Sequence, residues 1–267
     1  MTTLDDAGFE AIGVERLGDV LRLTIAHPFS PVNAVDDLLH QELTTLFRLL
    51  RQESMARAVV LTGKGRAFSA GGDFGWFPSL QNVERLHELR RDAKHLIWDL
   101  VDVEIPIVAA LNGAAVGLGA SIALLCDVII AADSATIADP HVRVGIVAGD
   151  GGTAIWPLLV GPARAKRYLL TGDPLTAQEA ERIGLINQVV AASELQDNAL
   201  ELARRLAGLP PLAVQYTKAA VNKLVKEALN LAFDAATGHE LLTLLSDDHR
   251  EALAAMAERR PPSFQGR

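Results

Sequence analysis

Two glycine-bearing segments have the composition of anion-binding turns. They are residues 67–73 (Ala-Phe-Ser-Ala-Gly-Gly-Asp) and residues 112–120 (Asn-Gly-Ala-Ala-Val-Gly-Leu-Gly-Ala). Each follows an apolar, strand-like run and leads toward a helical one, so backbone N–H groups at these junctions lack intrahelical partners. Two such junctions facing one pocket would form an oxyanion hole, which stabilises negative charge developing on a carbonyl oxygen. This pattern predicts acyl chemistry.

Two titratable residues further along the chain are candidates for acid–base chemistry in such a pocket. His141, in an Ala-Asp-Pro-His sequence, carries an imidazole that titrates near neutral pH. Asp150 follows nine positions later, and an aspartate that orients an imidazole is the arrangement of a catalytic triad without its serine. Both residues also have structural interpretations. Asp150 before Gly-Gly-Thr fits a helix N-cap, and His141 fits a buried or subunit-interface histidine.

Strands and helices alternate through the first part of the chain. Strands are predicted at residues 10–16, 20–26, 58–62, 107–111, 128–132 and 136–138, and helices at residues 35–50, 83–101 and 119–125. After about residue 151 the pattern is helical, with segments at residues 153–159, 163–170, 177–183, 193–207, 212–237 and 239–259. The sequence therefore predicts an α/β core over residues 1–200 and a helical region over residues 201–267.

Composition excludes several classes of protein. The chain has 267 residues and a formal net charge of −8, which argues against nucleic-acid binding. Its apolar runs are interrupted too early for a membrane span. The single cysteine, Cys126, and the lack of an apolar leader segment favour a cytoplasmic protein. Asp139, His141 and Asp150 lack the spacing typical of a metal site, so no metal is expected.

Taken together, a set of ordered motifs resembles the crotonase (enoyl-CoA hydratase/isomerase) superfamily. The matching stretches are residues 31–34, 66–73, 105–113, 117–119, 125–127, 170–172 and 177–186. The resemblance implies a ββα-superhelix core and a helical trimerisation region, in a trimer or a hexamer. It also implies thioester substrates, with coenzyme A bound as part of the substrate and no separate cofactor.

The family's sites are carried over residue by residue. The resemblance places the two oxyanion donors on the amides of Gly72 and Leu118. It places the coenzyme A and acyl contacts on Ser30, Val32, Ala34, Ala70, Asp73 and Trp76. The tail that carries Phe264 covers the neighbouring site in relatives. Gly72 as a simple turn glycine and Trp76 as ordinary packing remain alternatives, and Glu240 is a further residue that could reach the pocket.

The chain departs from the family's hydratases at both catalytic glutamates. Their positions correspond to Ser121 and His141. A serine hydroxyl has too high a pKa to act as an acid or base without a partner, whereas a histidine can do so. At Asp150 other crotonases also place an acidic residue, and the pair His141 and Asp150 resembles the dyad of crotonase-type β-diketone hydrolases.

Three functions follow from these observations. The first is an enzyme of the hydratase/isomerase type on coenzyme A thioesters, with a thioester enolate held in the oxyanion hole and His141 or Asp150 moving a proton. The second is a hydrolase that cleaves a carbon–carbon bond of a β-diketone or β-keto thioester by retro-Claisen chemistry. The third is a non-catalytic scaffold that binds acyl-CoA.

Overall fold

Two β-sheets form the centre of this computed structural model, which describes residues 3–267. The larger sheet has the order β1 (Ile12–Leu17), β2 (Val20–Ile25), β3 (Ala58–Gly63), β5 (Ile107–Leu111), β7 (Val128–Ala132) and β10 (Gln188–Val190). The smaller sheet has the order β4 (Ala67–Ser69), β6 (Ala114–Val116), β8 (Thr136–Ala138) and β9 (Leu175–Thr176). Only β1–β2 and β8–β9 pair antiparallel among the strands of the described chain.

The sheets are built from a repeated strand–strand–helix unit. β3 and β4, β5 and β6, and β7 and β8 are successive pairs that each place one strand in each sheet. The helices that follow these pairs are α2 (Val83–Asp102), α3 (Leu118–Leu124) and α4 (Gly152–Thr171). Every residue of β3 and β5 is buried, as expected for parallel strands covered on both faces. This repeat confirms the predicted ββα superhelix.

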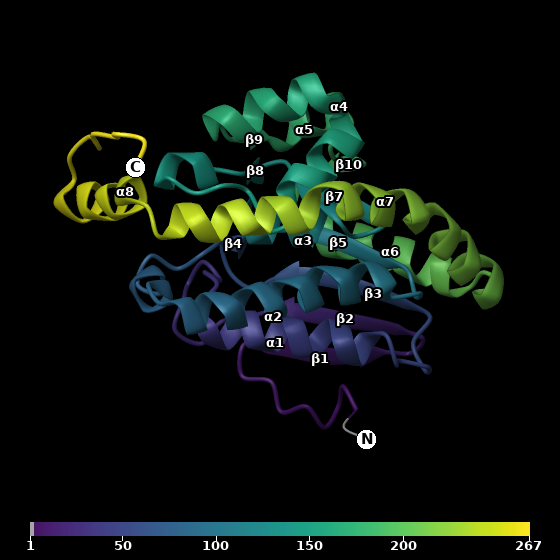
Figure 1. The fold of residues 1–267 in the computed structure, drawn as a ribbon. Helices are drawn as coiled ribbons and strands as arrows, with labels where there is room; N and C mark the ends of the chain where they lie inside the picture. The colour runs from purple at the N-terminus through teal and green to yellow at the C-terminus, as the bar shows by residue number, and fades with distance from the viewer. Residues whose placement is uncertain (1–2) are drawn as a thin grey trace.

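The remaining helices enclose the sheets. Figure 1 shows α1 (Asp37–Leu50) beside α2, with α7 (Pro211–Leu244) crossing the molecule between α2 and α4. The other elements are η1 (Phe77–Leu80), η2 (His141–Val144), α5 (Ala177–Arg182), η3 (Ala192–Glu194), α6 (Leu195–Ala207) and α8 (Asp247–Glu258). Within residues 3–267, none of the helices combines the length and hydropathy that a bilayer crossing requires.

The last two helices divide at a different place from the predicted one. The sequence predicted a break at Gly238, but α7 continues through that residue to Leu244. A glycine inside a helix costs only about 1 kcal/mol, whereas the true start of α8 has a cap, because the Ser246 side chain accepts a hydrogen bond from the His249 amide. As a result Glu240 lies on α7, where it reaches the interior.

Local features explain the start of α5 and the joint within α4. The Thr176 side chain caps α5 by accepting a hydrogen bond from the Glu179 amide at 3.2 Å. The two predicted helices at residues 153–159 and 163–170 are the two parts of α4, which meet at the non-helical Gly161.

The predicted boundary between the α/β core and the helical region, at residue 200, falls inside α6. Ala199 before it and Phe233 after it belong to one hydrophobic core.

Candidate active site

Gly72 and Leu118 follow two neighbouring strands. β4 and β6 run parallel, so the segments that leave their carboxyl ends meet at one edge. Gly71 has a φ of +80°, and a Cβ there would lie 2.9 Å from the Val116 carbonyl oxygen, so only glycine permits this approach. Within residues 3–267, the N–H groups of Gly72 and Leu118 donate to no protein acceptor.

Both predicted oxyanion residues line one cavity, here named the α2–α7 cavity. Its volume is about 70 Å³. Besides Gly72 and Leu118, its lining includes His40 from α1, Trp76 and Phe77, Arg90 and Ala93 from α2, Thr237 and Glu240 from α7, and both His141 and Asp150. A second cavity of about 90 Å³ shares Gly72 and His141 with the first and also contains Ala70. The two residues that carry the candidate amides therefore line the same cavity as the two candidate acid–base residues.

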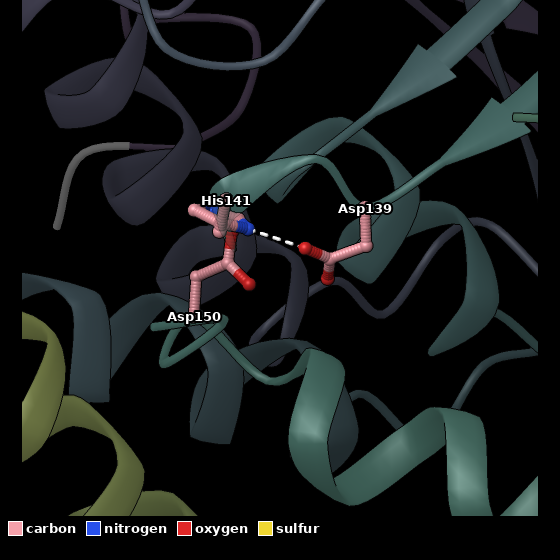
Figure 2. A group of neighbouring side chains, drawn as sticks. All are labelled: Asp139, His141 and Asp150. Carbon is pink, nitrogen blue, oxygen red and sulfur yellow. Dashed lines mark hydrogen bonds and ion pairs between the residues drawn. The ribbon is translucent and has the colours of Figure 1, made fainter. Parts of the chain in front are cut away.

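His141 lies between two carboxylates (Figure 2). Its Nδ1 is 2.5 Å from Asp139 Oδ1, and its Nε2 is 3.4 Å from Asp150 Oδ2. Asp139 is only 1% exposed, and its Oδ2 has no hydrogen-bond partner among residues 3–267. One ring nitrogen is thus fixed by Asp139, and the other is directed toward Asp150 and the cavity.

The position of Asp150 is set by three elements. Ser121 of α3 donates its hydroxyl to Asp150 Oδ1 at 2.9 Å. Thr237 of α7 donates to the carbonyl oxygen of Gly149 at 2.8 Å, which holds the loop before Asp150. The N-cap residue of α4 is Gly151, without a side-chain cap bond, although the Gly152 amide does contact the Asp150 carboxylate. Asp150 therefore binds Ser121 and approaches His141 in addition to any role at the helix start.

The buried cluster changes the protonation of its members. Burial lowers the pKa of His141, but the charges of Asp139 and Asp150 and the hydrogen bond to Asp139 outweigh it and raise the pKa to about 10. Burial raises the pKa of Asp150, with the charge of His141 opposing the shift. Burial also raises the pKa of Glu240 to about 8. At neutral pH His141 is therefore an imidazolium, and the carboxylates of Asp150 and Glu240 are stronger bases than exposed carboxylates.

Asp139 has a contact that the sequence did not indicate, whereas Glu240 lines the cavity, as the sequence suggested it could. From the sequence, Asp139 was considered only as a metal ligand. Its contact with His141 Nδ1 depends on the turn at Pro140 and on the start of η2, which no sequence pattern shows. Glu240 is separated from His141 by about a hundred residues, and its carboxylate packs against Gly149, where a Cβ would lie 2.5 Å from Glu240 Oε2. No local sequence pattern reveals the contact of Asp139 with His141 or that of Glu240 with Gly149.

The predicted coenzyme A residues are only partly brought together at the cavities. Trp76 lines the α2–α7 cavity and Ala70 lines the second one. Ala70 donates its amide to the Val32 carbonyl at 3.0 Å, so the segment at residues 30–34 lies beside it. Within that segment the Ser30 hydroxyl accepts from the buried Ala34 amide. Asp73 caps its own turn by accepting from the Gly75 amide. Ser30, Val32, Ala34 and Asp73 do not line either cavity.

The buried cluster around His141 could also be considered as a metal site. One donor atom from each of Asp139, His141 and Asp150 lies within 4.8 Å of the others. However, His141 Nδ1 and Asp139 already contact each other at hydrogen-bond distance. This leaves His141 Nε2 and the Asp150 carboxylate, 3.4 Å apart, to bind another group. The donor set is better suited to holding and moving protons, and the absence of a metal remains a prediction.

Gly117 controls the distance between the oxyanion turn and His141. It has a φ of +53°, and a Cβ there would lie 3.2 Å from His141 Cε1. Gly117→Ala should therefore destabilise the fold by about 1–3 kcal/mol through backbone strain and also displace the imidazole. Gly184→Ala is the matched control, because Gly184 has a φ of +81° with open space around it. Denaturant unfolding should show a lower free energy of unfolding for both variants, whereas the kcat of the enzyme should fall only for Gly117→Ala. Equal kcat values for the two variants would contradict a role of Gly117 in positioning His141.

The fold and the residues that line the α2–α7 cavity belong to an enzyme class that comparison with known families identifies. The family model described as enoyl-CoA hydratase/isomerase matches residues 15–267. The chain belongs to this family, the crotonase superfamily, whose members are enzymes. The sequence-based recognition of the family is thus confirmed.

Individual relatives have different activities. An enoyl-CoA hydratase/isomerase from Mycobacterium paratuberculosis is 38% identical, with a TM-score of 0.88 over 91% of this chain and 97% of that one. A β-diketone hydrolase from Anabaena sp. PCC 7120 is 30% identical, with a TM-score of 0.84 over 89% and 95%. The 1,2-epoxyphenylacetyl-CoA isomerase of Escherichia coli K12 is 33% identical over 257 residues, which cover 93% of this chain and 95% of that protein.

Proposed function

We propose that this protein hydrolyses a carbon–carbon bond of a β-dicarbonyl compound, with a β-diketone as the first candidate substrate. The observation that carries the proposal is His141 placed between two carboxylates, with Nε2 toward Asp150, in the cavity that Gly72 and Leu118 also line. The likeness to the Anabaena β-diketone hydrolase supports it. Ordinary hydration is less well supported, because Ser121 already donates its hydroxyl to Asp150 and is fully buried.

The site supplies each step of the reaction. Asp150 accepts a proton from water, and the hydroxide adds to one carbonyl carbon, giving a tetrahedral oxyanion. The carbon–carbon bond then breaks, and its electron pair forms an enolate on the other carbonyl, which the Gly72 and Leu118 amides stabilise. The imidazolium of His141 protonates the enolate carbon, and the proton on Asp150 returns to His141. The products are one carboxylic acid and one ketone.

The raised pKa values suit this division of roles. An imidazole with a pKa near 10 is charged at neutral pH, so His141 serves better as the acid than as the base that activates water. A carboxylate whose pKa is raised by burial is a stronger base than an exposed one. We therefore place the base on Asp150 and the acid on His141, with Asp139 holding the imidazole.

The proposed reaction has a direct isotopic test. The purified protein is incubated in H₂¹⁸O with acyclic and cyclic β-diketones and with a β-keto thioester, and products are identified by mass spectrometry. We expect one ¹⁸O atom in the carboxylic acid and none in the ketone beyond background exchange. Consumption of a short 2-enoyl-CoA by a folded protein that releases no acid from any of the β-dicarbonyls would overturn the proposal.

A second candidate function is isomerisation or hydration of an acyl-CoA thioester. The similarity to an acyl-CoA isomerase and to several hydratases favours it, because both reactions also use a stabilised thioester enolate. We propose that Ser30, Val32, Ala34, Ala70, Asp73 and Trp76 would then contact coenzyme A or the acyl group. A kcat/KM for CoA thioesters far above that for the free β-diketones would favour this candidate.

We also propose a trimer or a hexamer. α7 leaves large apolar side chains exposed, among them Leu212, Leu224 and Leu231, and extended exposed apolar surface marks interaction sites. The cytoplasm remains the predicted location.

A further inference from the structure

Two aromatic residues in the α2–α7 cavity have polar groups without protein partners. The indole Nε1–H of Trp76 is buried and has no acceptor among residues 3–267. The ring of His40, 5.7 Å away between centroids, makes no side-chain hydrogen bond in the same part of the chain and is 4% exposed. Both residues line the cavity. A buried donor left without a partner is rare and costly, so the Trp76 Nε1–H indicates a missing ligand group or water beside the ring of His40.

His40 is in its neutral form. Burial lowers its pKa to about 4, against the opposing charges of Asp92 and Asp37. A neutral imidazole presents one N–H donor and one acceptor, and an indole presents a donor only. The pair can therefore hold one uncharged or partially negative oxygen with two N–H groups, much as the two backbone amides do.

Retro-Claisen chemistry needs such a second donor set. Two substrate oxygens gain negative charge, one in the tetrahedral adduct and one in the departing enolate. The Gly72 and Leu118 amides can hold only one of them. Arg90 of α2 also lines this cavity. Thr237 already donates to main-chain carbonyls, and Glu240 lies against Gly149.

We propose that Trp76 Nε1–H and His40 form a second oxygen-binding subsite, which takes the other carbonyl oxygen of a compact β-dicarbonyl substrate. This inference rests on the proposed function and specifies the substrate class further. Together with the two amides, the subsite favours a substrate with two carbonyl oxygens, and it discriminates against a monoketone because its donors would remain unpaired.

The test compares binding of pentane-2,4-dione and pentan-2-one, which differ by one carbonyl oxygen. Dissociation constants are measured by NMR titration in a His141→Ala background, in which hydrolysis is not expected. The dione should bind about five- to tenfold more tightly, as expected for one additional hydrogen bond. Trp76→Phe removes the N–H but keeps an aromatic ring, and it should reduce this preference to about twofold or less.

A matched control separates the hydrogen bond from packing. Trp98 also has a buried Nε1–H without a protein partner in the described chain, but it lies on α2 outside both cavities. Trp98→Phe should leave the preference unchanged. A preference that persists in Trp76→Phe, or a parent protein that binds both ketones equally, would overturn the subsite. Because no turnover is needed, this outcome is distinct from failure of the proposed reaction, which appears as no acid product from the wild-type protein.

Discussion

Replacing His141 by alanine should reduce kcat for β-diketone hydrolysis by about 10³-fold or more. The imidazolium has two functions in the proposed mechanism, because it protonates the enolate and its charge opposes the rise in the pKa of Asp150. General acid–base groups typically contribute 10²–10⁴-fold to a rate. Without the imidazolium, the largest effect that opposes burial is lost, so the pKa of Asp150 rises further and its carboxyl group is less available to accept a proton from water.

The measurement must separate loss of chemistry from loss of fold. The alanine variant leaves the Asp139 carboxylate buried without its partner, so His141→Gln is made in parallel to retain a polar group. Circular dichroism reports folding of both, and added imidazole should restore part of the activity of the alanine variant. His87→Ala on the exposed side of α2 is the control, and it should keep the full rate. A His141→Ala protein that keeps more than a tenth of the wild-type kcat would contradict the assigned role.

Much of the framework can be predicted from the sequence because its signals are local. Continuous apolar runs identify the strands at residues 107–111 and 128–132, which match β5 and β7 residue for residue. The ordered glycine motifs identified the family, and they also located Gly72 and Leu118 on one cavity. Gly71, next to Gly72, reflects close backbone approach, because a Cβ there would lie 2.9 Å from the Val116 carbonyl oxygen.

The rest of the site depends on contacts between distant segments. Three-residue strands such as β4 and β6 are too short to show a periodicity. The break at Gly238 was wrong because packing of α7 on α2 and α4 outweighs the low helix propensity of one glycine. Asp139 illustrates the same limit. Its separation from His141 by one proline is visible in the sequence, but the 2.5 Å contact between their side chains follows only from η2.

Asp139→Asn should shift the alkaline limit of activity to lower pH. Asp139 raises the pKa of His141 through its charge and its hydrogen bond. Removing the charge lowers that pKa from about 10, so the imidazolium that serves as the acid is lost at a lower pH. We expect the alkaline limb of kcat to move down by about one pH unit or more, since one unit corresponds to only about 1.4 kcal/mol of charge interaction. Titration of the His141 ring by NMR measures the same change directly.

Stability provides a second readout that depends on the same charge. The pKa of His141 in the folded protein is above its unfolded value of 6.5, so its contribution to stability is full below about pH 6.5 and is lost as pH rises toward 10. In Asp139→Asn this alkaline loss should be smaller.

Asp99→Asn is the matched control. It removes another buried carboxylate, which lies on α2 and pairs with Arg51, and it should change neither the pH limit nor the His141 titration. If both aspartate variants shift the limit equally, the effect is a general loss of structure; if neither does, Asp139 does not hold the proton on His141. Only a shift specific to Asp139→Asn supports a relay in which one carboxylate fixes the imidazole and the other exchanges protons with substrate.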